Sequence, residues 1–259
     1  MTAPIQFACA HDVATITLNR PEKRNALNEA MWLGLAEAVR RADALPDAKI
    51  IVIRGAGGHF AAGADISEFD TVYASRERSA QYRAAVEDGA RAITDAAKPA
   101  IAMIEGNCIG GGMAIALACD LRIAAAGARC GITPAKLGIV YSFGDTKRLV
   151  DAVGPSKAKD ILFTGRIMDA AEANAIGLVD EVHAAEDLEK AVAAKCALLA
   201  GNSQWSIRGA KDMVRRILSG ATQESRETAD KFIDAVGQAD FREGRTAFME
   251  KRAPKFPYR

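Results

Sequence analysis

The sequence predicts an α/β fold in which a largely parallel sheet is followed by a tail made of helices. Strand patterns alternate with helical patterns in the first half of the chain, which is typical of βα units. The runs at 49–54 and 99–104 are almost wholly apolar, as expected for parallel strands that are covered on both faces. From about residue 145 onward strand patterns nearly stop and apolar residues recur at helical spacing, which predicts the tail.

The first predicted strand is Val13–Leu18, where β-branched and small residues alternate. A helix is expected to begin after Asn28, because asparagine suits the N-cap position and Met31, Leu35 and Val39 then form an apolar stripe. Further strands are expected at 49–54, 99–104 and 121–125, further helices at 79–97 and 113–119, and a loop at 106–112.

The second half of the chain is expected to be helical. Helical spacing is found at 145–153, 156–163, 170–175, 188–199, 206–218, 223–236 and 241–251. The chain therefore divides into a sheet-bearing core of roughly 200 residues and a helical region that follows it.

Composition narrows the class of protein. Hydrophobic residues make up 49% of the 259 residues and charged residues 26%, so a sizeable core is expected. A formal charge of +1 argues against a nucleic-acid partner. The five cysteines are scattered, without the spacing of a disulfide framework or a zinc site, which favours a reducing cytoplasm. We find no signal-peptide pattern and no apolar run of transmembrane length, so no membrane partner is expected.

Two loops rich in small residues follow predicted core strands. The first is 60–66 and the second is 106–112, which opens a helix. Small residues leave backbone N–H groups uncovered, and a helix N-terminus favours an anion. One N–H donor from each loop would form an oxyanion hole. The alternative is a pair of ordinary strand-to-helix turns, since a glycine triplet alone is a weak signal. Neither the dinucleotide fingerprint nor the phosphate-binding P-loop pattern is present.

Six segments, in order and over essentially the whole chain, are similar to the enoyl-CoA hydratase/isomerase (crotonase) family. They are NRPEKRNALN (19–28), HFAAGADISEF (59–69), GNCIGGGMAIALACDLRIA (106–124), AKLGI (135–139), FTGRIMDAAEANAIGLVDEV (163–182) and FMEKRAPKF (248–256). The resemblance implies a crotonase-like (ClpP/crotonase) spiral of ββα units with a C-terminal helical trimerisation region. Residues 1–200 would form the spiral core with the acyl-CoA site, and residues 201–259 the helical oligomerisation and lid region.

The resemblance also implies a homotrimer or hexamer that acts on an acyl-coenzyme A thioester. Coenzyme A would enter only as the thioester part of the substrate, and no prosthetic group or metal is implied. The oxyanion donors would be the backbone N–H groups of Ala64 and Gly111. Ala62, Asp65 and Ile66 would line the path of the adenine and pantetheine groups.

Further residues are implied at the nucleotide end of the ligand. Lys23 and Arg24 would lie near the coenzyme A phosphates, and Phe248, Lys251 and Phe256 would cover the nucleotide of a neighbouring subunit. The alternative for each of the three cations, taken singly, is a solvated surface charge.

The chain departs from the family at the acid/base positions. Hydratases of this family use two glutamates, and the matching positions here are Ala114 and Pro134. Neither side chain exchanges protons, and a positioned acid or base contributes about 10²–10⁴-fold to a rate. We therefore expect neither efficient hydration nor glutamate-dependent isomerisation.

The segment 133–141 (TPAKLGIVY) resembles the TPxxLGxxY segment of methylmalonyl-CoA decarboxylases in the same family. There the tyrosine helps to bind the carboxylate that leaves, so Tyr141 is the candidate here, with packing as its alternative. Those decarboxylases retain a glutamate where this chain has Ala114. Decarboxylation of a malonyl-type acyl-CoA is the reaction that this comparison favours.

Two other functions stay open. One is an enoyl-CoA hydratase with atypical acid/base residues, in which Asp145, Tyr141 or a bound water replaces the glutamates; the alternative for Asp145 is a helix N-cap. His59 and Glu105 are weaker candidates for a proton donor. The other function is a non-catalytic acyl-CoA-binding protein or an oligomeric scaffold.

Overall fold

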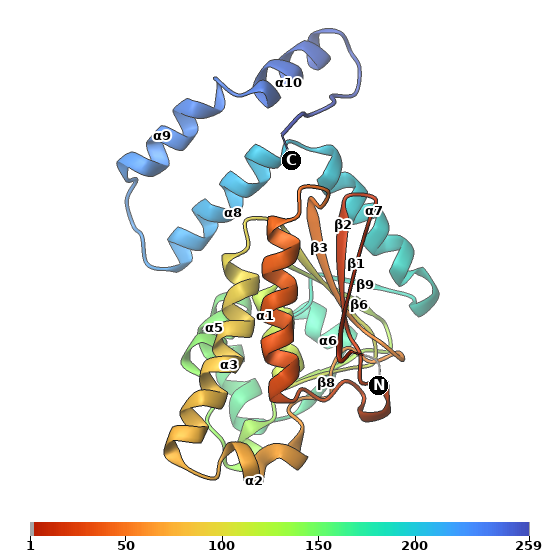
Figure 1. Ribbon diagram of the computed structural model, residues 1–259, viewed down its shortest axis with the longest axis vertical. Coiled ribbons are helices and arrows are strands. Elements are labelled where there is room, and N and C mark those ends of the chain that lie inside the picture. The colour runs from red at the N-terminus through yellow and green to blue at the C-terminus, as the bar shows by residue number, and fades with distance from the viewer. Residues whose placement is uncertain (1–2, 259) are drawn as a thin grey trace.

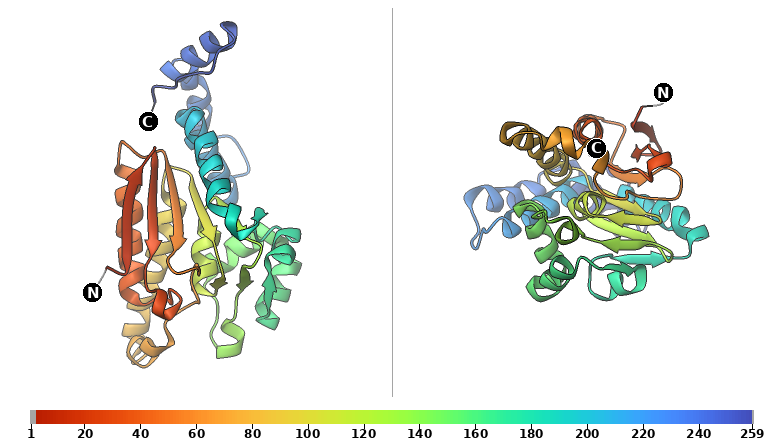
Figure 2. Two further views of the ribbon diagram at one scale, coloured as in Figure 1. Left: turned by 90° about the vertical axis from the view of Figure 1, so that its right-hand side faces the viewer. Right: turned by 90° about the horizontal axis from the view of Figure 1, so that it is seen from below.

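The computed structural model describes residues 3–258 and contains a six-stranded and a three-stranded sheet, with helices packed around them (Figures 1 and 2). The strand order of the larger sheet is β1-β2-β3-β4-β6-β9. Its strands are β1 (Ile5–Ala10), β2 (Val13–Leu18), β3 (Ile50–Gly55), β4 (Ala100–Ile104), β6 (Leu121–Ala125) and β9 (Glu181–His183). Every neighbouring pair after β1–β2 is parallel, so the predicted α/β fold with a largely parallel sheet is confirmed.

The central strands are apolar throughout because two hydrophobic clusters cover opposite faces of the sheet. Ile51 and Ile53 of β3 face the cluster that contains α1 (Glu29–Ala44) and α3 (Arg76–Asp95). Ile50 and Val52 face a second cluster, formed with α7 (Leu188–Gly201). Alternate residues of one strand therefore belong to different cores, as the period of two requires.

Two features of the sheets differ from the sequence prediction. The first strand begins at Ile5 rather than Val13, since β1 forms an antiparallel edge hairpin with β2 through His11 and Asp12, both with positive φ. The expected loop at 106–112 was wrong for five residues, because Gly111 and Gly112 already belong to the following helix and the other three form the strand β5 (Asn107–Ile109). This strand belongs to the smaller sheet, with β7 (Arg129–Gly131) and β8 (Ile167–Asp169). Three-residue strands are too short to show a periodicity.

The remaining helices of the core follow the predicted order. They are α2 (Phe69–Val72), α4 (Gly111–Ala118), α5 (Phe143–Thr164) and α6 (Ala170–Ala175), with short 3₁₀ turns at Pro21–Lys23, Ile66–Glu68, Pro134–Leu137 and Ala185–Asp187. The two helices expected at 145–153 and 156–163 form one element, α5, which is kinked at Gly154 before Pro155.

The tail helices are α8 (Gln204–Leu218), α9 (Arg226–Ala235) and α10 (Ala239–Met249); α8 lies against the core, with Lys211 donating to Lys98 O, and α9 and α10 extend away from it (Figure 1). Large apolar side chains on them are exposed in the single chain, among them Ile217, Phe232 and Ile233. Among the described residues, no helix is both long and apolar enough to span a bilayer.

Candidate active site

The two glycine loops lie side by side. Ala61 N–H donates to Asn107 O at 2.8 Å, and Ile109 N–H donates back to Ala61 O at 3.0 Å. On its other side the first loop pairs with the chain before α1, where Leu27 N–H donates to Gly63 O at 2.7 Å and Asp65 N–H donates to Leu27 O at 2.8 Å. The first loop therefore forms backbone hydrogen bonds with a different chain segment on each side.

The predicted oxyanion donors meet at this contact. A Cβ built on Gly111 would lie 3.9 Å from the Ala64 nitrogen, so the two amides are close neighbours. Within residues 3–258, neither the Ala64 N–H nor the Gly111 N–H donates a hydrogen bond. Gly111 is the first residue of α4, where the helix dipole adds partial positive charge.

Glycine is required in the second loop because the backbones approach closely. Gly110 has φ 52° and ψ −108°, a conformation that side chains disfavour. A Cβ on Gly111 would lie 3.0 Å from Leu27 Cδ1 and 3.2 Å from Trp32 Cζ2. A Cβ on Gly112 would lie 2.6 Å from Ala61 O. Small residues therefore allow both the contact between the loops and the uncovered amides.

Asn25, which the sequence reasoning did not single out, holds the chain segment that leads into the first loop. It is completely buried, and its Nδ2 donates to Ala56 O at 2.8 Å and to His59 O at 2.7 Å. Its Oδ1 accepts from Arg20 N–H at 2.8 Å. The sequence signal for Asn25 was its position in the segment 19–28. Its role is structural, because the side chain is buried and each of its polar atoms is paired.

A charged cluster surrounds Asp65 at the end of the first loop. Its carboxylate is 7% exposed and accepts from Arg20 at 2.8 Å, from Lys23 at 2.9 Å and from Ser67 Oγ at 2.6 Å. Burial raises the pKa of Asp65, but the hydrogen bonds from Ser67, Lys23 and Arg20 outweigh it and hold the pKa well below its ordinary value. Asp65 thus orders the loop through these ion pairs.

Lys23 and Arg24, the predicted cations near the first loop, differ in their contacts. Lys23 is 44% exposed, so its ammonium reaches solvent beside Asp65. Arg24 is exposed and has a positive φ of 50°, and its carbonyl accepts from Ala62 N–H at 3.0 Å. The turn therefore places Arg24 and Ala62 next to each other at the first loop.

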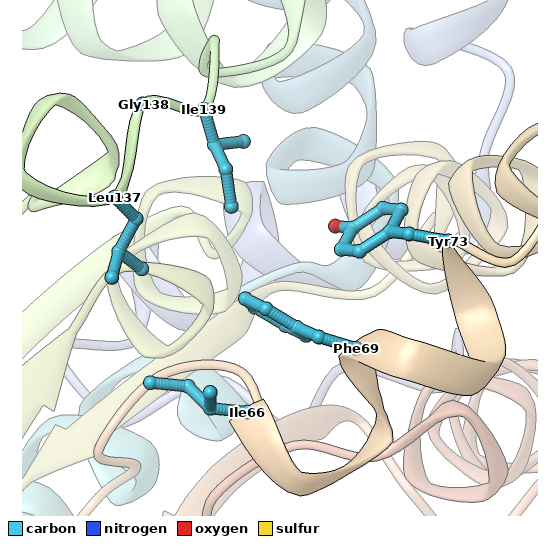
Figure 3. Close-up of a pocket in the computed structure, with 6 residues that line it drawn as sticks. All are labelled: Ile66, Phe69, Tyr73, Leu137, Gly138 and Ile139. Atoms are coloured by element: carbon cyan, nitrogen blue, oxygen red, sulfur yellow. The ribbon is translucent and has the colours of Figure 1, made fainter.

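A cavity of 480 Å³ lies between the segment that follows the first loop and residues 137–139 (Figure 3). Ile66, Phe69 and Tyr73 line one side, and Leu137 and Ile139 line the other. The Phe69 and Tyr73 rings pack edge to face, with centroids 5.0 Å apart. Every described side chain that lines the cavity is uncharged, which suits an apolar group.

The acid/base positions hold no proton carrier. Ala114 is 1% exposed inside α4, and Pro134 begins the 3₁₀ turn before the cavity-lining residues. Tyr141 does face the site, because its hydroxyl donates to Gly110 O at 3.3 Å. Burial, with a contribution from Asp145, raises the pKa of Tyr141 well above its ordinary value.

Asp145 has structural partners. It is buried, paired with Arg148, and accepts a hydrogen bond from Ser142 Oγ at 2.6 Å. The N-cap interpretation of Asp145 was wrong, because Ser142 caps α5 and Asp145 is the third residue of that helix. The other two candidates for a proton donor also have partners. His59 Nδ1 accepts from Asn107 N–H at 3.1 Å, and Glu105 forms an ion pair with Arg54.

The C-terminal candidates lie far from these loops in their own chain. Phe248, which is 82% exposed, is on α10, at the opposite end of the molecule from α2 (Figure 1). Lys251 follows α10 with a positive φ, and Phe256 folds back toward Gly244 of that helix. Within a single chain these three residues therefore do not reach the two loops.

Comparisons with known proteins place the chain in a family. A sequence profile described as enoyl-CoA hydratase/isomerase matches residues 9–259. The chain belongs to this family. A crotonyl-CoA hydratase of Syntrophomonas wolfei is 35% identical over 246 residues, 94% of each protein. A protein of Mycobacterium bovis described as a probable enoyl-CoA hydratase is 38% identical over 248 residues, 95% of each.

Solved structures show the same crotonase fold. An enoyl-CoA hydratase/isomerase family protein of Hyphomonas neptunium superposes with a TM-score of 0.96 and 46% identity, covering 99% of this chain and 98% of that one. An enoyl-CoA hydratase of Bacillus anthracis gives a TM-score of 0.90 and 30% identity, with coverage of 99% and 100%. The crotonase resemblance and the expected fold are therefore confirmed. Within residues 3–258, no cluster of His, Cys, Asp or Glu has the arrangement of a metal site.

Proposed function

We propose that the protein binds an apolar acyl-CoA thioester and stabilises the enolate form of that thioester between the amides of Ala64 and Gly111. The observation that supports the proposal is the contact between the two glycine loops. There the N–H groups of Ala64 and Gly111 lie close together, and neither donates a hydrogen bond to a described residue. Ala62, Asp65 and Ile66 would line the pantetheine and adenine path, with Lys23 and Arg24 near the phosphates. Two preorganised donors stabilise an oxyanion by several kcal/mol.

Hydration of a 2-enoyl-CoA is the reaction we favour. The relatives named above are hydratases, and the uncharged cavity beside the first loop suits an apolar acyl chain. Water adds its oxygen to C3 and gives up one proton, the π electrons move to the thioester oxygen, and the enolate takes up one proton at C2 as the thioester carbonyl reforms. No glutamate assists at Ala114 or Pro134, so we expect this reaction to be slow compared with that of a two-glutamate hydratase.

Decarboxylation of a malonyl-type acyl-CoA is the second candidate. It needs the same enolate stabilisation but less help from a base, and the segment 133–141 with Tyr141 favours it. Two observations count against it. The Tyr141 hydroxyl already donates to Gly110 O, and the side chains around the cavity include no cation to receive a second carboxylate.

The test is a panel of thioesters with purified protein. Crotonyl-CoA would be followed by loss of its enoyl absorbance, and methylmalonyl- and ethylmalonyl-CoA by release of CO₂. We expect measurable turnover of crotonyl-CoA that depends on Gly111. Faster CO₂ release would favour decarboxylation, and tight coenzyme A binding with no turnover of any thioester would favour the non-catalytic acyl-CoA-binding protein or scaffold.

We also propose that residues 201–259 carry the oligomer contacts of a homotrimer or hexamer, while residues 1–200 hold the site. The exposed apolar side chains of α8 and α9 support this, as does the distance of Phe248, Lys251 and Phe256 from their own site. A cytoplasmic location remains a prediction from the sequence. Analytical ultracentrifugation would test the assembly, and a monomer at micromolar concentration would contradict it.

A further inference from the structure

One peptide group connects Tyr141 with the proposed oxyanion site. The carbonyl of Gly110 and the N–H of Gly111 belong to the same peptide unit, which is trans. The Tyr141 hydroxyl donates to that carbonyl at 3.3 Å, a long contact for an O–H···O hydrogen bond, and Ala114 N–H donates to it at 3.0 Å. The N–H on the other side of the unit is the one that donates to no described residue.

We infer that Tyr141 is a positioning residue, which acts on the thioester through the Gly110–Gly111 peptide and not by touching the substrate. This inference rests on the proposed oxyanion function. A hydrogen bond accepted by an amide carbonyl polarises the whole amide, and each bond in such a chain strengthens the next by about 10–30%. The chain here runs from the tyrosine hydroxyl through the peptide to the thioester oxygen.

The surroundings keep the hydroxyl in place as a neutral donor. The partly buried Tyr141 ring packs against the main core and immediately precedes the Ser142 cap of α5. The nearby charges are Asp145 and Arg148, which form an ion pair with each other. The preceding peptide unit is fixed as well, because Gly110 N–H donates to Gly131 O at 2.8 Å.

This role competes with a direct role in decarboxylation. A phenol carries one proton and donates one strong hydrogen bond. Donation to a substrate carboxylate would remove the bond to Gly110 O and weaken the Gly111 donor at the moment when the enolate forms. The two roles of Tyr141 are therefore distinguishable by whether the hydroxyl affects a thioester that has no carboxylate.

The experiment uses hexanoyl-CoA with a ¹³C-labelled thioester carbonyl, a saturated ligand that cannot be hydrated. Difference infrared spectroscopy measures how far the carbonyl band moves to lower frequency on binding. We expect Tyr141→Phe to reduce this displacement by about 10–30% with little change in Kd. Replacing Tyr141 by 3,5-difluorotyrosine, a stronger donor of the same shape, should enlarge it.

Tyr258→Phe is the control, because it removes a phenolic hydroxyl from a ring that packs against Trp205, outside both loops and the cavity. If the wild-type protein shows no displacement, the oxyanion proposal itself fails and this inference with it. If the wild type shows a displacement that neither substitution at Tyr141 alters, only the role of Tyr141 is overturned. The fluorinated variant keeps the ring, so the test holds even if the phenylalanine variant folds poorly.

Discussion

The two glycine loops and the segment 133–145 lie at the same site but differ in what supplies the chemistry. In the loops the functional groups are backbone amides, held by contacts such as Ile109 N–H to Ala61 O. In the segment the function of the family depends on side chains, and here Pro134 is inert and Asp145 is paired with Arg148. Charge stabilisation needs only small residues and a fixed backbone, whereas proton transfer needs one particular side chain. The loops can therefore stay functional where the segment has changed.

The largest expected effect is on the backbone side of this comparison. Gly111→Pro deletes the N–H and should lower turnover of the active thioester by about 10²–10³-fold, the cost of one oxyanion donor. Steady-state kinetics would measure it. Gly111→Ala is the control, because it keeps the N–H but adds the Cβ that would lie 3.0 Å from Leu27. Equal losses in both variants would mean that packing, not the amide, is what matters.

The missing side chains can be tested by restoring the two glutamates of the family. The double substitution Ala114→Glu and Pro134→Glu should raise hydration of crotonyl-CoA by about 10²-fold or more, since a positioned acid or base contributes 10²–10⁴-fold. The single variant Ala114→Glu places a carboxylate at a buried position and should be less stable than the wild type. A double variant that binds coenzyme A but hydrates no faster would show that the missing glutamates do not limit this protein.

The rigidity of the loops depends on Asn25. Asn25→Ala leaves Ala56 O, His59 O and Arg20 N–H without their partner in a buried place, so the free energy of unfolding should fall by about 2–3 kcal/mol. Denaturant titration would measure the loss. Asn19→Ala is the control, since Asn19 makes one exposed hydrogen bond to Ala3 O. A loss no larger than that of the control would mean that the loops hold their shape without the asparagine.

The α/β fold could be predicted from local patterns in the sequence, whereas the choice of the Ala64 and Gly111 amides came from the family resemblance, because small-residue loops alone are a weak signal. Apolar strands such as Ile50–Gly55 and glycines such as Gly111 leave signals within a few residues. The pairing of Ala61 with Cys108 and the threefold bonding of Asn25 depend on residues far apart in the chain, so no local pattern reports them. The same holds for Tyr141, whose segment indicated the site but not which atom its hydroxyl meets.

The smallest expected effect concerns the charges around the first loop. The ionised carboxylate of Asp65 is favoured in the folded protein, where its pKa lies below the ordinary value. Its contribution is therefore complete at pH values above about 4, the ordinary aspartate range, and is lost as the pH falls further and the unfolded chain takes up the proton first. Asp65→Asn should lower the free energy of unfolding at pH 7 by about 2 kcal/mol, the scale of hydrogen bonds to a charged group.

The pH dependence of this stability difference between wild type and Asp65→Asn tests whether the charge of Asp65 orders the first loop. Between pH 7 and pH 5 the gap between wild type and Asp65→Asn should stay constant, and below about pH 4 it should shrink. Asp70→Asn, on an exposed aspartate of α2, is the control and should leave stability nearly unchanged at every pH. A gap that stayed constant down to pH 2 would mean that the Asp65 charge is not what orders the loop. The first loop would then owe its shape to its backbone pairing and to the hydrogen bonds of Asn25.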